Sequence, residues 1–227
     1  MNKIFVMALG GSIICPDGID VSYLKNFYDF IVKEIAAGKK FIIVTGGGNP
    51  ARQYQRAAGE IVPISDQDKD WLGIHATRLN AHLLRTIFAK QAHPVILEHR
   101  GKIIDFDGYS VIIAAGWRPG WSTDFVAVQI AVDFNVDKVL ILGKPDFVYN
   151  KDNQRFSDAT PFTNLTWQEY LKLIPNEWSP GIHAPVDPVA AKLARQEGIE
   201  VIVADGKNLE NLKNILEERK FKGTMIK

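Results

Sequence analysis

The stretch VTGGGNPARQY, residues 44–54, begins at the end of the apolar run FIIV and leads into a helix-like segment that carries Arg52. Glycine has no Cβ, so a chain uses it where the backbone takes a positive φ or approaches another group closely. The three successive glycines, Gly46 to Gly48, therefore mark a place where some neighbour leaves no room for side chains. The order of strand, glycine-rich turn and helix recurs along the chain.

Apolar runs of strand length alternate with segments of helical periodicity. Strands are predicted at residues 4–9, 41–44, 93–97, 110–116, 138–143 and 200–206, and helices at residues 21–37, 71–90, 123–134, 188–197 and 208–219. Because the strands are continuously apolar and alternate with helices, the pattern predicts an α/β fold with a parallel sheet covered on both faces. Residues 150–179 have weaker periodicity, and we interpret them as the looser part of a second lobe.

The composition is that of an ordinary globular protein, with 227 residues, 46% of them hydrophobic and 23% charged. We expect a single domain over residues 1–227. The net charge of +1 provides no overall field for nucleic acid or an anionic membrane, so any anion must be bound by local geometry. The single cysteine, Cys15, excludes an internal disulfide framework. The apolar run near the N-terminus is too short for a membrane span, and it lacks the layout of a signal peptide. Both features predict a cytoplasmic protein.

Glycine-bearing turns follow four of the predicted strands, at residues 10–12, 45–48, 115–123 and 142–144. In an open α/β sheet, ligands bind beyond the carboxyl ends of the strands, and helix N-termini offer N–H groups to phosphate. We therefore interpret the three glycines as lying against an anion, most simply phosphate oxygens, or against the backbone of a nucleotide site; the alternative is a set of tight turns. Neither a Walker loop nor the dinucleotide G-x-G-x-x-G is present. No metal-ligand spacing, and no catalytic role, is assigned to His75, His82, His93, His99 or His183.

The turns, in this order, resemble those of the amino acid kinase family, and within it those of the archaeal-type UMP kinases. The likeness runs through LGGSI, VTGGGNPARQY, DWLGIHATRLNAHLL, GWRPGWSTDFVAVQIA, DFVYNKD, PVDPVAAKLA and KGT. It implies a three-layer α/β/α sandwich with a largely parallel central sheet, the carbamate kinase-like fold. It also implies transfer of the ATP γ-phosphoryl group to UMP with Mg²⁺, by a homo-oligomer of hexameric type. The acceptor would lie mainly on the N-terminal part, and ATP on the part from about residue 140.

The resemblance also implies roles for individual residues. Gly10, Gly11 and Ser12 would hold the transferring phosphates through backbone N–H groups, and Arg52 would face these phosphates. Lys144 is added to this catalytic set as a hypothesis of our own, since the family pattern has no lysine there, and the alternative is a solvated lysine in a loop. The implied UMP site is Gly47, Asp70, Trp117, Arg118, Pro119, Gly120, Trp121, Ser122 and Thr123. The implied ATP site is Ala8, Leu9, Gly10, Gly11, Ser12, Gly48, Arg52, Gly143, Lys144, Tyr149 and Asp152. Asp70 would bind ribose hydroxyls, Ser122 and Thr123 would donate to the UMP phosphate, and Asp124 would help organise the centre.

These residue types suit phosphoryl transfer, which needs in-line positioning and charge neutralisation more than acid or base help. UMP is already a phosphate monoester, so its attacking oxygen needs no strong base. Arg52 can grip phosphate with two parallel hydrogen bonds, where a lysine would act as a point charge.

Several of these residues also have structural interpretations, which the sequence leaves open. Asp70 could complement the dipole of a helix starting near Trp71, and Ser122 could cap the following helix. Asp187 could be a cap as well. Thr123 could cap the same helix as Ser122, and Arg52 could be an ordinary solvated helix residue. Trp117 and Trp121 could shape the pocket or belong to the core. Arg78 and Asn80 are interpreted as holding loops or subunits together.

The chain departs from the family pattern mainly on the donor side. Ala8 stands where many members have a lysine that reaches the transferring phosphate, and Phe147 replaces a glycine in the segment from Gly143 to Asn153. We hypothesise that Lys144 supplies the charge that Ala8 cannot. Two alternatives to a UMP kinase follow: a kinase for another small acceptor, and a non-catalytic homologue that binds a nucleotide or oxyanion.

Overall fold

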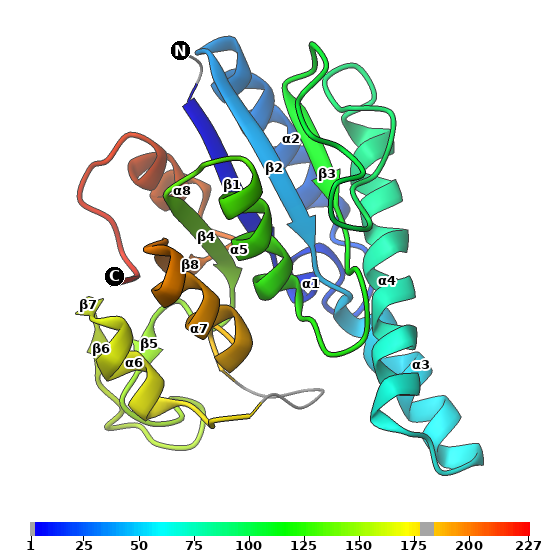
Figure 1. Cartoon of the computed structure of the whole chain (residues 1–227), viewed down its shortest axis with the longest axis vertical. Coiled ribbons are helices and arrows are strands. Elements are labelled where there is room, and N and C mark those ends of the chain that lie inside the picture. The colour runs from blue at the N-terminus through cyan, green and yellow to red at the C-terminus, as the bar shows by residue number, and fades with distance from the viewer. Residues whose placement is uncertain (1–2, 178–183) are drawn as a thin grey trace.

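The computed structural model describes residues 3–177 and 184–227, and it shows a seven-stranded sheet with helices on both faces (Figure 1). The strand order is β3–β2–β1–β4–β8–β9–β7. All neighbouring strands are parallel except β8 and β9. The strands are β1 (Lys3–Leu9), β2 (Lys39–Thr45), β3 (Val111–Ala114), β4 (Lys138–Gly143), β7 (Asn164–Leu165), β8 (Glu200–Asp205) and β9 (Thr224–Ile226), with a separate antiparallel pair of β5 (Val148–Tyr149) and β6 (Pro161–Phe162).

The helices form two layers around this sheet, which confirms the predicted three-layer α/β/α sandwich. They are α1 (Gly11–Ile14), α2 (Val21–Ala36), α3 (Gly48–Ile61), α4 (Asp66–Ile87), α5 (Thr123–Asp133), α6 (Trp167–Leu173), α7 (Pro188–Glu197) and α8 (Leu209–Leu216). One core contains side chains of α5, α6 and α7, and the other contains side chains of α2, α4 and α8. Successive residues of β1 point to opposite cores, as the pleat requires, with Val6 in the first and Met7 in the second.

Two predictions of local structure are wrong, and a third segment has one helix that was not predicted. Residues 93–97 form no strand; Leu97, and Ala92 just before this segment, make only isolated bridges to the edge strand β3. Helix α4 begins at Asp66, not near Trp71, because Ser65 caps it and its polar first turn carries no apolar signal. Within residues 150–179, interpreted as the looser part of a second lobe, the helix that was not predicted is α6, which begins with a complete capping box between Thr166 and Glu169.

Two of the glycine turns pack directly against each other. A Cβ on Gly11 would lie 2.0 Å from the backbone nitrogen of Gly48, and a Cβ on Gly46 would lie 2.3 Å from the backbone nitrogen of Gly11. Gly48 also has φ +68°, and its Cβ would lie 2.4 Å from the Gly11 carbonyl oxygen. Neighbouring backbone, and not an anion, therefore leaves no room for side chains at Gly46 and Gly48. The interpretation that an anion lies against these two glycines is wrong. At Gly47 the crowding neighbour is the Ala51 methyl, 2.9 Å from the Cβ position.

Two further findings concern the sequence predictions. No helix among residues 3–177 and 184–227 combines the length and the apolar character needed to cross a membrane. His183, predicted to be non-catalytic, lies outside the described residues.

Candidate active site

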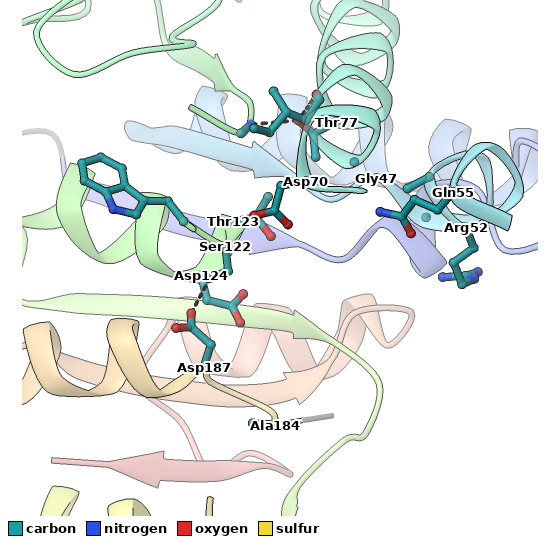
Figure 2. A pocket seen from close by; sticks show the side chains of 16 residues that line it. Gly47, Arg52, Gln55, Asp70, Thr77, Ser122, Thr123, Asp124, Ala184 and Asp187 are labelled. Carbon is teal, nitrogen blue, oxygen red and sulfur yellow. Dashed lines mark hydrogen bonds between the residues drawn. The ribbon is translucent and has the colours of Figure 1, made fainter. Parts of the chain in front are cut away.

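A cavity of about 300 Å³ lies where the carboxyl ends of β2 and β3 meet α3, α4 and the N-terminus of α5 (Figure 2). It brings together these residues of the sequence-predicted site: Gly47, Gly48, Arg52, Asp70, Trp121, Ser122 and Thr123. Asp124 and Asp187 line it as well. Gln55 and Thr77 also line it, and the sequence analysis assigned neither of them a role.

Ser122 is both the cap of α5 and part of the cavity wall. Its side-chain oxygen accepts a hydrogen bond from the Phe125 N–H (3.0 Å), and its hydroxyl donates to Oδ2 of Asp187. The proton of this hydroxyl is thus committed within the protein. An anion at the start of α5 would instead meet the backbone N–H groups of the first turn, beside Thr123.

Asp187 joins α5 to α7. Its Oδ1 accepts from the N–H groups of Val189 (2.8 Å) and Ala190 (3.1 Å), so the cap interpretation of Asp187 is confirmed. The same carboxylate receives the Ser122 hydroxyl and is almost fully buried. One side chain therefore ties the N-termini of two helices together at the cavity.

Asp124, in the first turn of α5, has the most perturbed carboxyl group of the site. Burial between α5 and α7, reinforced by the neighbouring carboxylate of Asp187, raises the pKa of Asp124 to about 8. A carboxyl group with such a pKa favours the neutral form, or a cation beside it, at neutral pH.

This raised pKa predicts how stability depends on pH. Between its unfolded pKa, near 4, and its folded pKa, near 8, Asp124 is protonated in the folded chain and ionised in the unfolded one. The unfolded state then binds fewer protons, so this group lowers stability as the pH rises through that window. Asp124→Asn is expected to gain roughly 1–2 kcal/mol over the wild-type protein between pH 5 and pH 8, a range discounted for contact with solvent.

Urea unfolding at several pH values measures this gain, with the exposed Asp137→Asn as the matched control. The free-energy difference between Asp124→Asn and the wild-type protein should grow with pH, whereas the difference for Asp137→Asn should stay constant. A pH-independent difference for Asp124→Asn would contradict the assignment.

Asp70 faces the cavity from the second turn of α4. Its Oδ2 accepts from the Gly120 N–H at 2.8 Å, and burial raises the pKa of this carboxyl. The acids of the first turn of α4 are Asp66 and Asp68. These two residues therefore complement the helix dipole. The interpretation that Asp70 does so is wrong, because the helix begins four residues before it.

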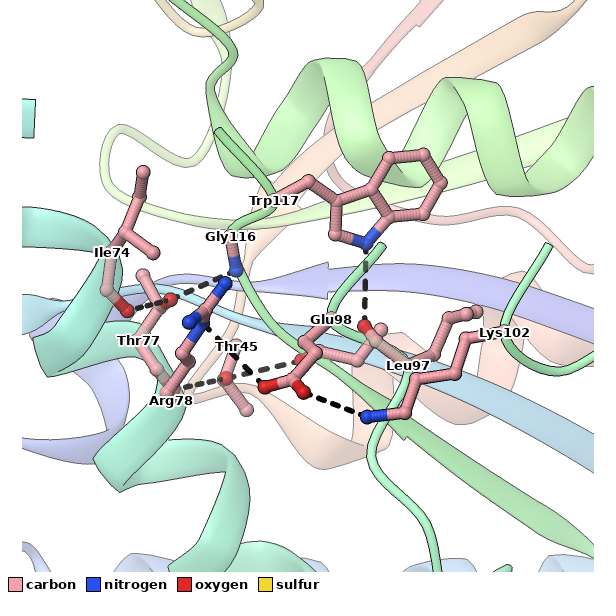
Figure 3. A network of polar contacts seen from close by, with 10 residues as sticks. Thr45, Ile74, Thr77, Arg78, Leu97, Glu98, Lys102, Gly116 and Trp117 are labelled. Carbon is pink, nitrogen blue, oxygen red and sulfur yellow. Dashed lines mark hydrogen bonds and ion pairs between the residues drawn. The ribbon is translucent and has the colours of Figure 1, made fainter. Parts of the chain in front are cut away.

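Helix α4 also fixes the loops that surround the cavity (Figure 3). The Thr77 hydroxyl donates to the Ile74 carbonyl (2.6 Å) and accepts from the Gly116 N–H (2.8 Å). Asn80 Nδ2 donates to the carbonyls of Gly46 (2.7 Å) and Gly47 (3.2 Å), so Asn80 holds a loop, as one interpretation predicted. Both side chains are buried.

Arg78 lies outside the cavity, with its Nε 3.7 Å from Oε2 of Glu98, which is also paired with Lys102. It is partly exposed, in keeping with a structural or interface role.

The two tryptophans that flank the Pro119–Gly120 turn have different environments. Trp117 is buried in the core, and its indole N–H donates to the Leu97 carbonyl at 3.2 Å. Trp121 lines the cavity, and the Arg118 guanidinium lies 3.9 Å from its ring centroid. The pocket role is thus open to Trp121, whereas Trp117 supports the wall from behind.

Of the residues implied for the ATP side, Gly48 and Arg52 line this cavity, whereas the others lie outside it, at or after the neighbouring strand ends. Ala8 and Leu9 are buried within β1. The Gly10 N–H donates to the Leu142 carbonyl (2.8 Å), and the Cβ position of Gly10 is 3.3 Å from Gly143 Cα, so these two turns lie side by side.

The other residues implied for the ATP side follow β4. Lys144 and Asp152 are exposed, and Asp152 pairs with Arg155 at 3.3 Å. The Tyr149 hydroxyl donates to Asp146 Oδ1 at 2.9 Å.

Comparison with known proteins gives a consistent result. Residues 3–205 match the amino acid kinase family. The chain is 34% identical over 222 residues to a uridylate kinase of Thermoplasma volcanium, covering 96% of this chain and 94% of that protein. It is 31% identical over 223 residues to a uridylate kinase of Methanospirillum hungatei JF-1, covering 97% and 93%. The crystal structure of uridylate kinase from Archaeoglobus fulgidus superposes with a TM-score of 0.80 at 26% identity, over the full length of both chains.

Proposed function

The chain belongs to the amino acid kinase family, and from this premise we propose that it is a UMP kinase, which transfers the γ-phosphoryl group of ATP to UMP and releases UDP and ADP. The observation that carries the proposal is the composition of the cavity. Arg52 and the N-terminus of α5 provide hydrogen-bond donors for a phosphate, and Asp70 provides an acceptor for hydroxyl groups. A nucleoside monophosphate presents the complementary set.

In the proposed reaction, Arg52 and the N–H groups at the start of α5 hold the UMP phosphate. One of its oxygens attacks the γ-phosphorus of ATP, a new P–O bond forms, and the bond to the β-phosphate oxygen breaks. The attacking phosphate oxygen is already ionised, so no residue needs to remove a proton. The protein contributes alignment and charge neutralisation.

We place the ATP phosphates over the adjoining turns at Gly10 and Gly143. These turns meet at the carboxyl edge of the sheet, since β1 and β4 are parallel neighbours with Leu9 opposite Leu142. The N–H groups of Gly11 and Ser12 begin a short helix there, and Lys144 follows directly after β4. The acceptor and donor groups would thus approach each other along one sheet edge.

Mg²⁺ is part of the proposal, with ATP as the donor. Among the described residues, no group of three or more His, Cys, Asp or Glu side chains could form a protein cage for a metal. Mg²⁺ commonly uses only one or two carboxylates together with substrate phosphates and water. Asp124 is the candidate, because a cation beside its carboxyl group would lower the raised pKa and favour the ionised form. When bound, the ion would neutralise charge that develops on the transferring phosphoryl group.

The proposal includes assembly into a homo-oligomer of hexameric type, working in the cytoplasm. What supports an oligomer is the apolar surface that α3, α4 and the loop between them expose: Tyr54, Ile61, Val62, Trp71 and Leu79. Exposed apolar side chains gathered on adjoining elements are typical of protein interfaces. Light scattering during size-exclusion chromatography measures the mass, and a monomer would contradict this part.

A parallel assay tests the function. Purified protein with ATP and Mg²⁺ receives UMP, CMP, dUMP, carbamate or acetylglutamate, and ADP release is measured for each acceptor. We expect turnover with UMP. Release of ADP with carbamate or acetylglutamate but not UMP would identify another acceptor. No turnover with any acceptor, in protein whose melting temperature UMP still raises, would identify a non-catalytic homologue.

Lys144 provides a test of the donor side. If its ammonium group contacts the transferring phosphoryl group, Lys144→Ala should lower kcat at least about tenfold and change the KM for UMP less than about twofold. Steady-state kinetics measures both constants, with the exposed Lys220→Ala as the control. An unchanged kcat for Lys144→Ala would show that Lys144 does not supply the positive charge that Ala8 lacks.

A further inference from the structure

Gln55 is a polar residue of the cavity for which the proposed reaction has no assigned role. It lies on α3, three residues after Arg52, so the two side chains share one face of the helix. Figure 2 shows it on the same cavity wall as Gly47, on the side that faces Asp70. It is half-buried, and its amide contacts α4.

The amide of Gln55 has a defined orientation. Its Nε2 donates to the Lys69 carbonyl oxygen at 2.8 Å. A carbonyl can only accept, so the NH₂ group must face it, which leaves Oε1 as the free acceptor of this side chain, beside one further N–H donor. Gly73 leaves room for this arrangement, since a Cβ there would already be 3.4 Å from Nε2.

Asp70 offers a second acceptor in the same cavity. Gln55 is bonded to the residue that precedes Asp70, and Asp70 uses only Oδ2 for the Gly120 N–H. The second carboxylate oxygen of Asp70 and the Oε1 of Gln55 are thus two acceptors on side chains that both line the cavity. Arg52 and the N-terminus of α5 present donors elsewhere on its wall.

We propose that Gln55 is a specificity-determining residue, which accepts a hydrogen bond from one of the two ribose hydroxyls of the acceptor nucleotide while Asp70 accepts from the other. Two neighbouring acceptors match a pair of adjacent hydroxyls, which only a ribonucleotide carries. The cavity then discriminates against deoxynucleotides, because a missing hydroxyl leaves a polar atom of its wall without a partner. This inference rests on the proposed function, in which the acceptor is UMP.

The test is a substrate comparison with Gln55→Met, which keeps the length of the side chain and removes its hydrogen bonds. The values of kcat/KM and of the equilibrium Kd are measured for UMP, 2′-deoxy-UMP, 3′-deoxy-UMP and CMP. The loss of one hydrogen bond should weaken the binding of UMP, and lower its kcat/KM, by about 3-fold to 10-fold. The deoxy analogue that lacks the hydroxyl contacted by Gln55 should be unaffected, so the preference for UMP over that analogue falls by the same factor. Gln53→Met, an exposed glutamine of the same helix, should change neither constant.

The main competing role for Gln55 is structural, holding α3 against α4. In that case Gln55→Met would weaken the binding of UMP and of both deoxy analogues by the same factor, and the inference would be overturned. It would also be overturned if the variant lost its preference for UMP over CMP instead, since Gln55 would then be reading the base. If the wild-type protein binds UMP without turnover, the proposed kinase function fails, and the Kd comparison alone decides the role of Gln55.

Discussion

Gly11→Ala is expected to remove most of the stability of this protein. The added Cβ would lie 2.0 Å from the backbone nitrogen of Gly48, 2.6 Å from its Cα and 2.7 Å from the carbonyl carbon of Gly46. All three atoms are backbone, which cannot rotate away as a side-chain end can. The two turns would have to separate, and with them the strands β1 and β2, which pair along their whole length. We expect a loss above about 3 kcal/mol, the upper range for overpacking.

Urea unfolding measures this loss, with Gly18→Ala as the control. A Cβ on Gly18 meets no atom within 4 Å, and its substitution should shift the free energy of unfolding by less than about 0.5 kcal/mol. If Gly11→Ala unfolded at the same urea concentration as the wild-type protein, the close approach of the two turns would be refuted. The same experiment separates the two explanations of the glycines, because a ligand-facing glycine would change nucleotide affinity without unfolding the chain.

Arg52→Ala is expected to have the largest effect on catalysis that leaves the fold intact. Arg52 is exposed at the cavity edge on α3, a helix with no buried residue, so removing it opens no void in the core. If its guanidinium grips the UMP phosphate in the transition state, kcat/KM for UMP should fall by about 100-fold to 1,000-fold. Arg52→Lys should recover only part of this loss, because an ammonium group cannot form two parallel hydrogen bonds.

The control for this prediction is Arg56→Ala, on the same helix but outside the cavity. It removes the same charge and should lower kcat/KM less than about twofold. Equal effects of the two substitutions would mean that Arg52 acts only through the general charge of α3. The unfolding free energies of both variants should stay within about 0.5 kcal/mol of the wild-type value.

The central layers were predictable because their signals are local. Strands β1, β2, β4 and β8 are continuous apolar runs, which is what burial on both faces requires. The helix predicted at residues 188–197 has the bounds of α7, and Asp187, predicted as a possible cap before Pro188, does cap it. The sequence prediction was wrong at residues 93–97, which have an apolar pattern but do not pair as a strand. It also missed the start of α4 at Asp66, because the first turn of that helix is polar.

The candidate site was predicted in part. The resemblance indicated Arg52, Asp70 and Thr123, and the structure gathers them around one cavity. Gln55 was missed because a glutamine in a polar helix carries no signal of its own. Its place in the cavity wall and its contact with the Lys69 carbonyl, both tertiary, distinguish it from the exposed Gln53.

The sequence by itself determined the fold class, the family and the strand ends at which a ligand can bind, since these depend on periodicity and on motifs within short segments. The tertiary structure alone decided what stands opposite each residue. Ser122 and Asp187 are 65 positions apart and share a hydrogen bond, and the neighbour of Gly46 is the backbone of Gly11. Such contacts arise only when the sheet brings distant turns to one edge, because a glycine or a carboxylate has the same local signal whether it meets backbone, a cap or a ligand.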